Sequence, residues 1–385
     1  MYLLKLIARN SLRHKLRTAL TTLGIVIAVL AFGLLQTVVD AWYAGADSAS
    51  ATRLVTRNAI SLVFPLPITY RDRIRRIDGV REISYANWFG GVYISERNFF
   101  PQFAVDARSY FRIYPELGVP AEQLESFLRD RKGCVVGHKL AQTWGWKVGD
   151  VIPLRGTIYP GTWEFTLRGI YEGRDAATDE VQFFFHWDYL NETLRKSAPR
   201  RADTTGIFVV EIDEAERAAE IARAVDATFR NSLAETLTET EKAFQLGFVS
   251  MTEAIVVAIR LVSFLVIVII LAVMANTMAM SARERLAEYA TLKAIGFGPS
   301  FVRRLVFGES LCIAVAGSVI GCLLTFPVSR AFAQKMGTLF PVFQVSQETV
   351  VLQLVAGIAI GIVAAIAPGI RAGNVRIAEG LRAVG

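Results

Sequence analysis

Four stretches of this chain are each long enough and apolar enough to cross a lipid bilayer. The hydrocarbon core of a bilayer is about 30 Å thick, and a helix crosses it with roughly 20 apolar residues. The four stretches lack Asp, Glu, Lys, Arg and His, and they comprise residues 18–39, 261–282, 310–329 and 349–370. Such runs favour an integral membrane protein over a soluble protein with buried helices. A cleaved signal peptide is the alternative for the first run, which is longer than the apolar core of about 7–15 residues typical of signals.

The stretches are arranged as one span followed by three, and residues 41–253 between the first two have ordinary polar composition. We therefore predict an α-helical membrane protein with four transmembrane helices (1+3) and an α+β extracytoplasmic domain inserted between helices 1 and 2. The expected parts are a cytoplasmic amphipathic segment 1–17, transmembrane helix 1 at 18–40, the inserted domain with its stalk at 41–253, transmembrane helix 2 at 254–282, a cytoplasmic helix at 283–300, transmembrane helix 3 at 301–330, a short outer loop at 331–348, transmembrane helix 4 at 349–370 and a cytoplasmic tail at 371–385.

Positive charge predicts the orientation of these spans, because Lys and Arg accumulate in short cytoplasmic loops. Residues 1–17 carry five basic side chains and no acidic one: Lys5, Arg9, Arg13, Lys15 and Arg17. The loop after the second span and the C-terminal tail are also rich in Arg, whereas residues 41–253 contain 26 basic and 29 acidic residues. We expect a multi-pass protein of the bacterial inner membrane, with both termini cytoplasmic and the large domain periplasmic. Anionic lipid headgroups account for the net charge of +7 without a nucleic-acid partner.

The inserted region has the strand and turn signals of a mixed domain. Strands are expected after the Asp78-Gly79 turn and at residues 134–136, 151–154 and 206–212, and helices at 139–144 and 218–229. Segment 232–253 is polar and lacks Pro, so we expect a helical stalk continuous with the second span.

Residues with the potential for catalysis are scattered. The histidines and cysteines lack the spacing of a metal site or of a nucleophile with its base; they are His14, His138, His186, Cys134, Cys312 and Cys322. The pair Asp179-Glu180 is interpreted as a solvated turn rather than a general acid/base pair. We therefore predict a non-catalytic chain that binds no metal and no cofactor.

Residues 281–299 have the signals of a short helix on the cytoplasmic side. Ser281 and Glu284 fit a capping box, Gly296 marks a helix end, and Gly298-Pro299 opens the next helix. The charged side chains of Arg285, Glu288 and Lys293 are expected to face a protein partner. The alternative is an amphipathic helix lying on lipid headgroups.

This segment resembles the coupling loop of the MacB/FtsX/LolC class of ABC transporter permeases, whose pattern is close to S-x-x-E-R-x-x-E-I-G-x-L-(K/R)-A-I-G. The matching residues are Ser281, Glu284, Arg285, Glu288, Leu292, Lys293, Ala294, Ile295 and Gly296. The chain departs from the pattern at Tyr289 and Ala290. The segments "VDARSYFRIYPEL" and "VVGHKLAQTWGWKVGDVIPL" resemble the MacB-like periplasmic core, and "APGIRAGNVRIAEGLRAVG" resembles the C-terminal end of the class.

The resemblance implies a permease subunit of an ATP-driven transporter. The chain lacks the phosphate-binding G-x-x-x-x-G-K-(S/T), so ATP and Mg²⁺ are expected on a separate, dimeric ABC ATPase. The resemblance assigns contact with that ATPase to Glu284, Arg285, Glu288, Leu292, Lys293 and Gly296. It also implies a second permease copy or a sister permease, with a periplasmic adaptor or a lipoprotein as a further partner. The pairs Gly317/Gly321 and Gly357/Gly361 are expected to pack within one subunit rather than to form a dimer seam.

Two functions remain open at this point. In the first, the periplasmic domain moves in response to ATP hydrolysis and exports or extracts an amphipathic, lipid-like, peptide or drug substrate. In the second, the same mechanics regulate a periplasmic or cell-wall enzyme, as FtsX does, and nothing is transported. The size of the inserted domain favours the first.

Overall fold

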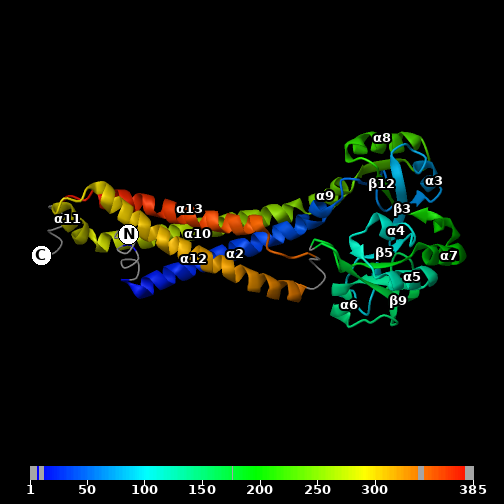
Figure 1. Cartoon of the computed structure of the whole chain (residues 1–385), viewed down its shortest axis with the longest axis horizontal. Helices are drawn as coiled ribbons and strands as arrows, with labels where there is room; N and C mark the ends of the chain where they lie inside the picture. The colour runs from blue at the N-terminus through cyan, green and yellow to red at the C-terminus, as the bar shows by residue number, and fades with distance from the viewer. Residues whose placement is uncertain (1–6, 8–12, 176, 337–341, 378–385) are drawn as a thin grey trace. The chain divides into compact units, whose positions relative to one another are not determined.

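The computed structural model describes residues 7, 13–175, 177–336 and 342–377, and the chain divides into two compact units. The helical unit contains the described parts of Met1–Asp40, Glu253–Lys335 and Phe343–Gly385. The αβ unit contains Ala41–Thr252 together with the described parts of Met336–Val342. Figure 1 labels the helices and some of the strands of the two units.

Long helices that run beside one another form the helical unit (Figure 1). In the described part of the chain, four helices have the length and hydropathy to span a membrane. They are α2 (Lys15–Ser48), α10 (Glu253–Glu284), α12 (Pro299–Met336) and α13 (Gln347–Gly373), and the short α11 (Leu286–Ala294) lies between α10 and α12. The predicted outer loop 331–348 is wrong in its first part, since α12 continues through residues 331–336. Apolar periodicity locates a span, but it does not reveal how far the helix continues beyond the lipid.

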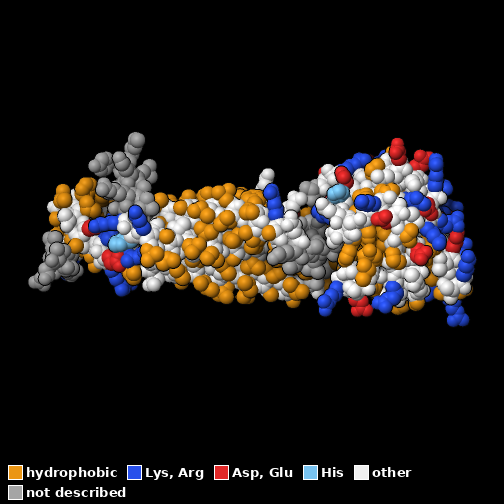
Figure 2. Space-filling view, turned by 90° about the horizontal axis from the view of Figure 1, so that it is seen from below, with side chains coloured by type: hydrophobic (Ala, Val, Ile, Leu, Met, Phe, Trp, Pro, Cys, Tyr) orange, Lys and Arg blue, Asp and Glu red, His pale blue; other side chains and the backbone are white. Residues whose placement is uncertain are grey.

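Most apolar side chains on these helices face outward. Figure 2 shows them covering the visible surface of the helical unit, with charged side chains near one end of it. Phe264, Leu323 and Val355 are among the exposed apolar residues of α10, α12 and α13. A surface of this size with so little charge is stable only against lipid or another apolar surface.

Glycines allow the helices to approach one another closely. A Cβ atom on Gly317 would lie 2.8 Å from the side chain of Ile25 in α2, and one on Gly361 would lie 2.7 Å from Ala314 in α12. A Cβ atom on Gly357 would clash with Ser318. The prediction that these glycines pack within one subunit is confirmed.

Two polar clusters also join the long helices. Gln353 of α13 is fully buried, and its Nε2 atom donates to the carbonyl of Val29 and to Thr325 Oγ1, both at 2.8 Å. Asp40 of α2 accepts hydrogen bonds from Ser346 and Thr349 at the start of α13, both at 2.7 Å. Contacts of this kind fix the register of helices that otherwise share only apolar surface.

A mixed β-sheet forms the centre of the αβ unit. In the described part of the chain, the sheet has 11 strands in the order β13-β1-β12-β3-β5-β10-β7-β9-β8-β4, with β6 paired to β9. The strands are β1 (Arg53–Asn58), β3 (Val80–Trp88), β4 (Gly91–Val92), β5 (Gln102–Val105), β6 (Leu117–Gly118), β7 (Gly133–Gly137), β8 (Val151–Gly156), β9 (Gly161–Gly173), β10 (Phe183–His186), β12 (Ile207–Ile212) and β13 (Thr236–Thr240), and a separate pair is formed by β2 (Leu66–Pro67) and β11 (Thr204–Thr205).

Helices cover both faces of this sheet. Alternate residues of a strand point to opposite faces, so Phe183 and Phe185 of β10 join one apolar core while Phe184 joins the other. The first core includes residues of α3 (Tyr70–Ile74), α6 (His138–Trp144), α7 (Trp187–Ser197) and α8 (Ala218–Thr228). The second includes residues of α4 (Tyr110–Ile113) and α5 (Ala121–Arg129). The strands and helices predicted for residues 134–144, 151–154 and 206–229 are confirmed.

The predicted helical stalk at 232–253 is wrong. Residues Thr236–Thr240 form strand β13, which pairs with β1. Only the following segment is helical, as α9 (Glu241–Met251), and Thr252 separates this helix from α10. Thr236 and Thr238 both donate hydrogen bonds at 2.8 Å to Asp226 of α8. The buried face of this strand is therefore polar, and its composition resembles that of an exposed helix.

The buried His186 makes the stability of the αβ unit depend on pH. Its Nε2 atom lies 2.7 Å from the carbonyl of Phe127, and because a carbonyl only accepts, this nitrogen carries the proton. Burial lowers the pKa of His186 below 6.5, although the hydrogen bond to Phe127 opposes the shift. A lowered folded-state pKa means that its contribution is complete above the unfolded-state value of about 6.5 and is lost as the pH falls below that value through the folded-state pKa.

We expect the melting temperature of the full chain in detergent to fall between about pH 7.5 and about pH 5.5, and to fall less in His186→Gln. The glutamine can donate to the same carbonyl but does not titrate. Equal pH dependence of the two proteins, measured by near-ultraviolet circular dichroism, would contradict this assignment.

Candidate functional site

The short helix α11 and the residues that hold it form the candidate site. Helix α10 ends at Glu284, Arg285 is the residue before α11, and Gly296 follows the helix with φ +107°. A left-handed residue at this position is the usual end of a helix and favours glycine. The predicted helix end at Gly296 and the start of α12 at Pro299 are confirmed.

The predicted capping box at Ser281 and Glu284 is wrong. Both residues lie within α10, and Ser281 is buried there. The apolar periodicity of α10 stops at Ala282, but its backbone hydrogen bonds continue to Glu284. Instead of capping α11, Glu284 accepts two hydrogen bonds of 2.7 Å from the guanidinium of Arg17 in α2.

Arg285 lies inside the helical unit. Its side chain is 7% exposed, and its Nη1 atom donates at 2.7 Å to Glu309 of α12, whose side chain is 9% exposed. Its Nε atom donates at 3.0 Å to Glu288 of α11. The charge of Arg285 is therefore neutralised within the chain and fixes α11 to α12, and its contact with a partner stays a prediction.

Glu288 lies beside the Arg285–Glu309 ion pair and is also paired within the chain. Its carboxylate accepts hydrogen bonds from Arg285 and from Arg13 of the N-terminal segment. Partial burial disfavours its charge, but the hydrogen bonds from the two arginines outweigh burial and lower the pKa of Glu288. Its side chain is still 39% exposed, so it remains accessible.

Lys293 connects α11 to the end of α13. Its Nζ atom donates at 2.8 Å to the carbonyl of Gly373 and at 2.7 Å to that of Val375. The last carbonyls of a helix lack partners within the helix, and a lysine stabilises them by hydrogen bonding and by its charge. Leu292 is half-buried and packs against the apolar core of the helical unit. Five of the six predicted contact residues therefore make contacts within the chain around α11: Glu284, Arg285, Glu288, Leu292 and Lys293.

Two exposed apolar residues flank Gly296, and their exposure was missed in the sequence analysis. Ile295 is 71% exposed and Phe297 is 43% exposed, with the Phe297 ring stacked on that of Phe301 at 4.5 Å. The signal was present in the sequence, since both apolar residues adjoin a glycine in a segment expected outside the membrane. We call Ile295, Gly296 and Phe297 the α11 tip.

A metal centre requires several ligating side chains grouped together. Within residues 7, 13–175, 177–336 and 342–377, no three His, Cys, Asp or Glu side chains are grouped so that they could hold a metal ion. The geometry is that of a braced helix with an exposed apolar tip, which suits contact with another protein.

Comparisons with known proteins agree with this architecture. The family model of the MacB-like periplasmic core domain matches residues 18–228, and the FtsX-like permease C-terminal model matches residues 260–377. An uncharacterized ABC transporter permease of Methanocaldococcus jannaschii is 24% identical over 323 residues, which are 80% of this chain and 77% of that relative. The ABC transporter permease YtrF of Bacillus subtilis is 44% identical over 54 residues, which are 14% of this chain and 12% of that relative.

Solved structures resemble the chain only distantly. The periplasmic region of MacB from Actinobacillus actinomycetemcomitans has a TM-score of 0.38 at 7% identity and covers 52% of this chain and 94% of its own. The extracellular domain of the noncanonic ABC-type transporter YknZ from Gram-positive bacteria has a TM-score of 0.36 at 10% identity and covers 49% of this chain and 100% of its own. Likenesses this weak support no conclusion about function.

Four apolar helices with a mixed α and β domain between the first and second define a multi-pass membrane permease. The chain belongs to the MacB/FtsX-type family of ABC transporter permeases. Membership in this family indicates a non-catalytic transport subunit and implies an ABC ATPase partner. The helices and the MacB-like domain fit a multi-pass protein of the inner membrane.

Proposed function

We propose that this chain transmits ATP-driven movement of a separate, dimeric ATPase to its αβ unit, and thereby exports or extracts an amphipathic substrate. ATP and Mg²⁺ are bound by the ATPase, which contacts the α11 tip and Glu288 on the cytoplasmic face. Both termini lie on that face and the αβ unit lies in the periplasm. A second copy of this chain or a sister permease completes the transporter, and an adaptor or lipoprotein is its periplasmic partner.

The bracing of α11 is the observation that carries this proposal. Hydrogen-bonded ion pairs join the α11 region to α12 through Arg285 and to α2 through Glu284, and Lys293 joins it to the end of α13. A force applied to the α11 tip is therefore transmitted through these bonds to α2, α12 and α13. A helix lying loosely on lipid headgroups needs no such bracing.

The connections between the two units support the same proposal. Helix α2 runs without interruption from Lys15 to Ser48 and so contains residues of both units. Between α9 and α10 the only residue outside a helix is Thr252. Helices transmit displacement along their axes far better than flexible loops do.

The proposal predicts that Glu288→Lys raises the Kd for binding of the ATPase by roughly tenfold or more, since the reversed charge disfavours the contact. Phe297→Asp should have a similar effect, because it places a carboxylate in an apolar contact. The measurement is pull-down of the cognate ATPase by the full chain in detergent, with stimulated ATP hydrolysis as a second readout. Ile94→Asp, at a 79% exposed position in the αβ unit, is the matched control and should bind normally.

A charge exchange separates a direct role of Glu288 from a structural one. The double variant Arg13→Glu/Glu288→Lys restores an ion pair with the N-terminal segment but keeps the reversed charge at position 288. Because position 288 also faces Arg285, the melting temperature of the double variant is measured as well, and continued weak binding at an unchanged melting temperature supports direct contact with the ATPase. Normal binding by the double variant and by Phe297→Asp would refute the assigned interface.

A further inference from the structure

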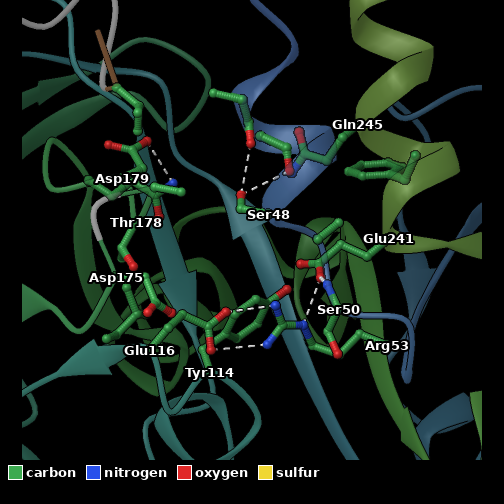
Figure 3. A pocket seen from close by; sticks show the side chains of 18 of the residues that line it. Ser48, Ser50, Arg53, Tyr114, Glu116, Asp175, Thr178, Asp179, Glu241 and Gln245 are labelled. Atoms are coloured by element: carbon green, nitrogen blue, oxygen red, sulfur yellow. Dashed lines mark hydrogen bonds and ion pairs between the residues drawn. The ribbon is translucent and has the colours of Figure 1, made fainter. Parts of the chain in front are cut away.

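The αβ unit contains a cavity of about 930 Å³ that the coupling function does not use. Small-molecule sites usually have volumes of about 300–1,000 Å³. One wall is formed by the end of α2 and the first turns of α9, and the opposite wall by the segment after β9 together with Glu116 (Figure 3). In Figure 3, Ser48 and Gln245 lie across the cavity from Asp175 and Thr178.

Aromatic rings contribute to the apolar lining of the cavity. Five rings line it, and they come from α2, β5, α4, the loop after α4, and α9; they are Trp42, Phe103, Tyr110, Tyr114 and Phe244. Some are fixed by further contacts: the Nε1 atom of Trp42 donates to Thr252 at 2.7 Å, and the guanidinium of Arg53 lies 4.4 Å from the centre of the Tyr114 ring. Rings held in this way present flat, apolar and electron-rich faces to a ligand.

Carboxylates exceed cations in the lining. The acidic residues are Glu116, Asp175, Asp179 and Glu241, and the basic ones are Arg53 and Arg174. Arg53 forms ion pairs with both Glu116 and Glu241, at 2.6 and 2.7 Å, so its single charge is shared between two carboxylates.

The two aspartates differ in how far they are engaged. Asp179 accepts hydrogen bonds from the backbone of Val181 and from Gln182, so it is a structural residue rather than the solvated turn residue predicted. Asp175 is exposed, and in the described part of the chain its carboxylate has no hydrogen-bond or ion-pair partner. The rim of the cavity therefore carries a negative charge that a ligand can neutralise.

The combination of aromatic rings and excess carboxylates discriminates between classes of ligand. An anion would approach a site with more carboxylates than cations, which is unfavourable at short range. A fully apolar lipid would remove Asp175 from water without giving it a partner, which costs free energy. A molecule with a flat apolar body and a positively charged group satisfies both the rings and the carboxylates.

We propose that this cavity binds an amphipathic cation, with its apolar body against the five rings and its positive group near Asp175 and Glu116. The inference deepens the proposed function, because it names the substrate class of the same transporter. The end of α2 and the start of α9 form one wall, so a displacement of these helices changes the width of the cavity. Transport of the ligand then follows from the movement that the ATPase drives.

Binding is tested with the full chain in lipid nanodiscs, without the ATPase. The probe is rhodamine 6G, an aromatic cation, and fluorescein, an anion with the same ring core, is its matched control. We expect the fluorescence anisotropy of rhodamine 6G to rise with protein concentration and that of fluorescein to remain unchanged. Asp175→Lys should weaken binding of rhodamine 6G by roughly tenfold or more, because a like charge replaces the opposite one. Phe244→Ala should weaken it by several-fold, since one ring is lost.

Glu122→Lys provides the matched charge reversal, since Glu122 is exposed on α5 and does not line the cavity. It should bind rhodamine 6G as the unaltered chain does. Absence of rhodamine 6G binding, equal binding of fluorescein, or equal weakening by Glu122→Lys and Asp175→Lys would each overturn the proposal. Because the ATPase is absent, failure of the α11 interface leaves this result unaffected, and the two proposals fail independently.

Discussion

Replacing Arg285 with Ala is expected to lower the free energy of unfolding of the helical unit by about 3–5 kcal/mol, which is the usual cost of breaking a buried ion pair. The substitution leaves Glu309 buried and without the guanidinium 2.7 Å away. It also removes the hydrogen bond to Glu288 and so releases α11 from α12. The expected result is a large loss of thermal stability of the full chain in detergent, measured by circular dichroism.

A paired replacement distinguishes the cost of leaving a buried charge unpaired from the cost of losing side-chain packing. Arg285→Met/Glu309→Leu removes both charges and keeps apolar volume, so it should recover most of the stability. Its ATPase binding should still be reduced, because α11 is no longer held by the ion pair. A cost of less than about 1 kcal/mol for Arg285→Ala would indicate a solvated pair and would contradict the burial described above.

Replacing Arg53 with Met is expected to lower the free energy of unfolding of the αβ unit by about 3–5 kcal/mol. Arg53 and Glu241 are each only 7% exposed, and Glu116 completes the cluster at 25% exposure. Met retains much of the apolar stem but leaves Glu241 without its cationic partner. Because Glu241 also accepts a hydrogen bond of 3.0 Å from the backbone of Ser50, the loss should loosen the joint between β1, α9 and the end of α2.

Arg57→Met provides the matched comparison, since Arg57 lies on the same strand. Its ion pair with Glu239 is more exposed, at 21% and 25%, and should contribute less than about 1 kcal/mol. Near-ultraviolet circular dichroism is a suitable readout because the core is rich in aromatic rings. Similar losses of unfolding free energy for Arg53→Met and Arg57→Met would show that burial does not strengthen the contribution of Arg53 to stability.

Local signals in the sequence were sufficient for the spans and for the ends of several elements. The four apolar runs located the long helices because a bilayer permits few charges over roughly 20 residues. Gly296 and Pro299 marked the end of α11 and the start of α12 because a positive φ and a fixed φ are properties of single residues. The strand after Gly79 was also predicted from its turn.

The role of each charged residue in the candidate site depended on partners that are distant in sequence. Glu284 bonds to Arg17, 267 residues away, and Arg285 bonds to Glu309, 24 residues away. A motif match placed these residues in one loop but could not distinguish those that brace the loop from those that remain accessible. Burial is a property of the packed helices and not of the local pattern.

Composition and periodicity alone thus specified four membrane spans with an inserted mixed domain, because hydropathy, charge and turn residues act over short stretches of chain, and the permease class followed from the resemblance of the 281–296 segment. Only the tertiary structure identified the polar strand β13, the buried Arg285 and Arg53, and the ring-lined cavity. They depend on contacts between positions far apart in sequence: Arg285 and Glu309 are 24 positions apart, Arg53 and Glu241 are 188 apart, and Leu54 of β1 pairs with Thr240 of β13. Such contacts exist only once helices and sheet are packed, and for this reason no local pattern encodes them.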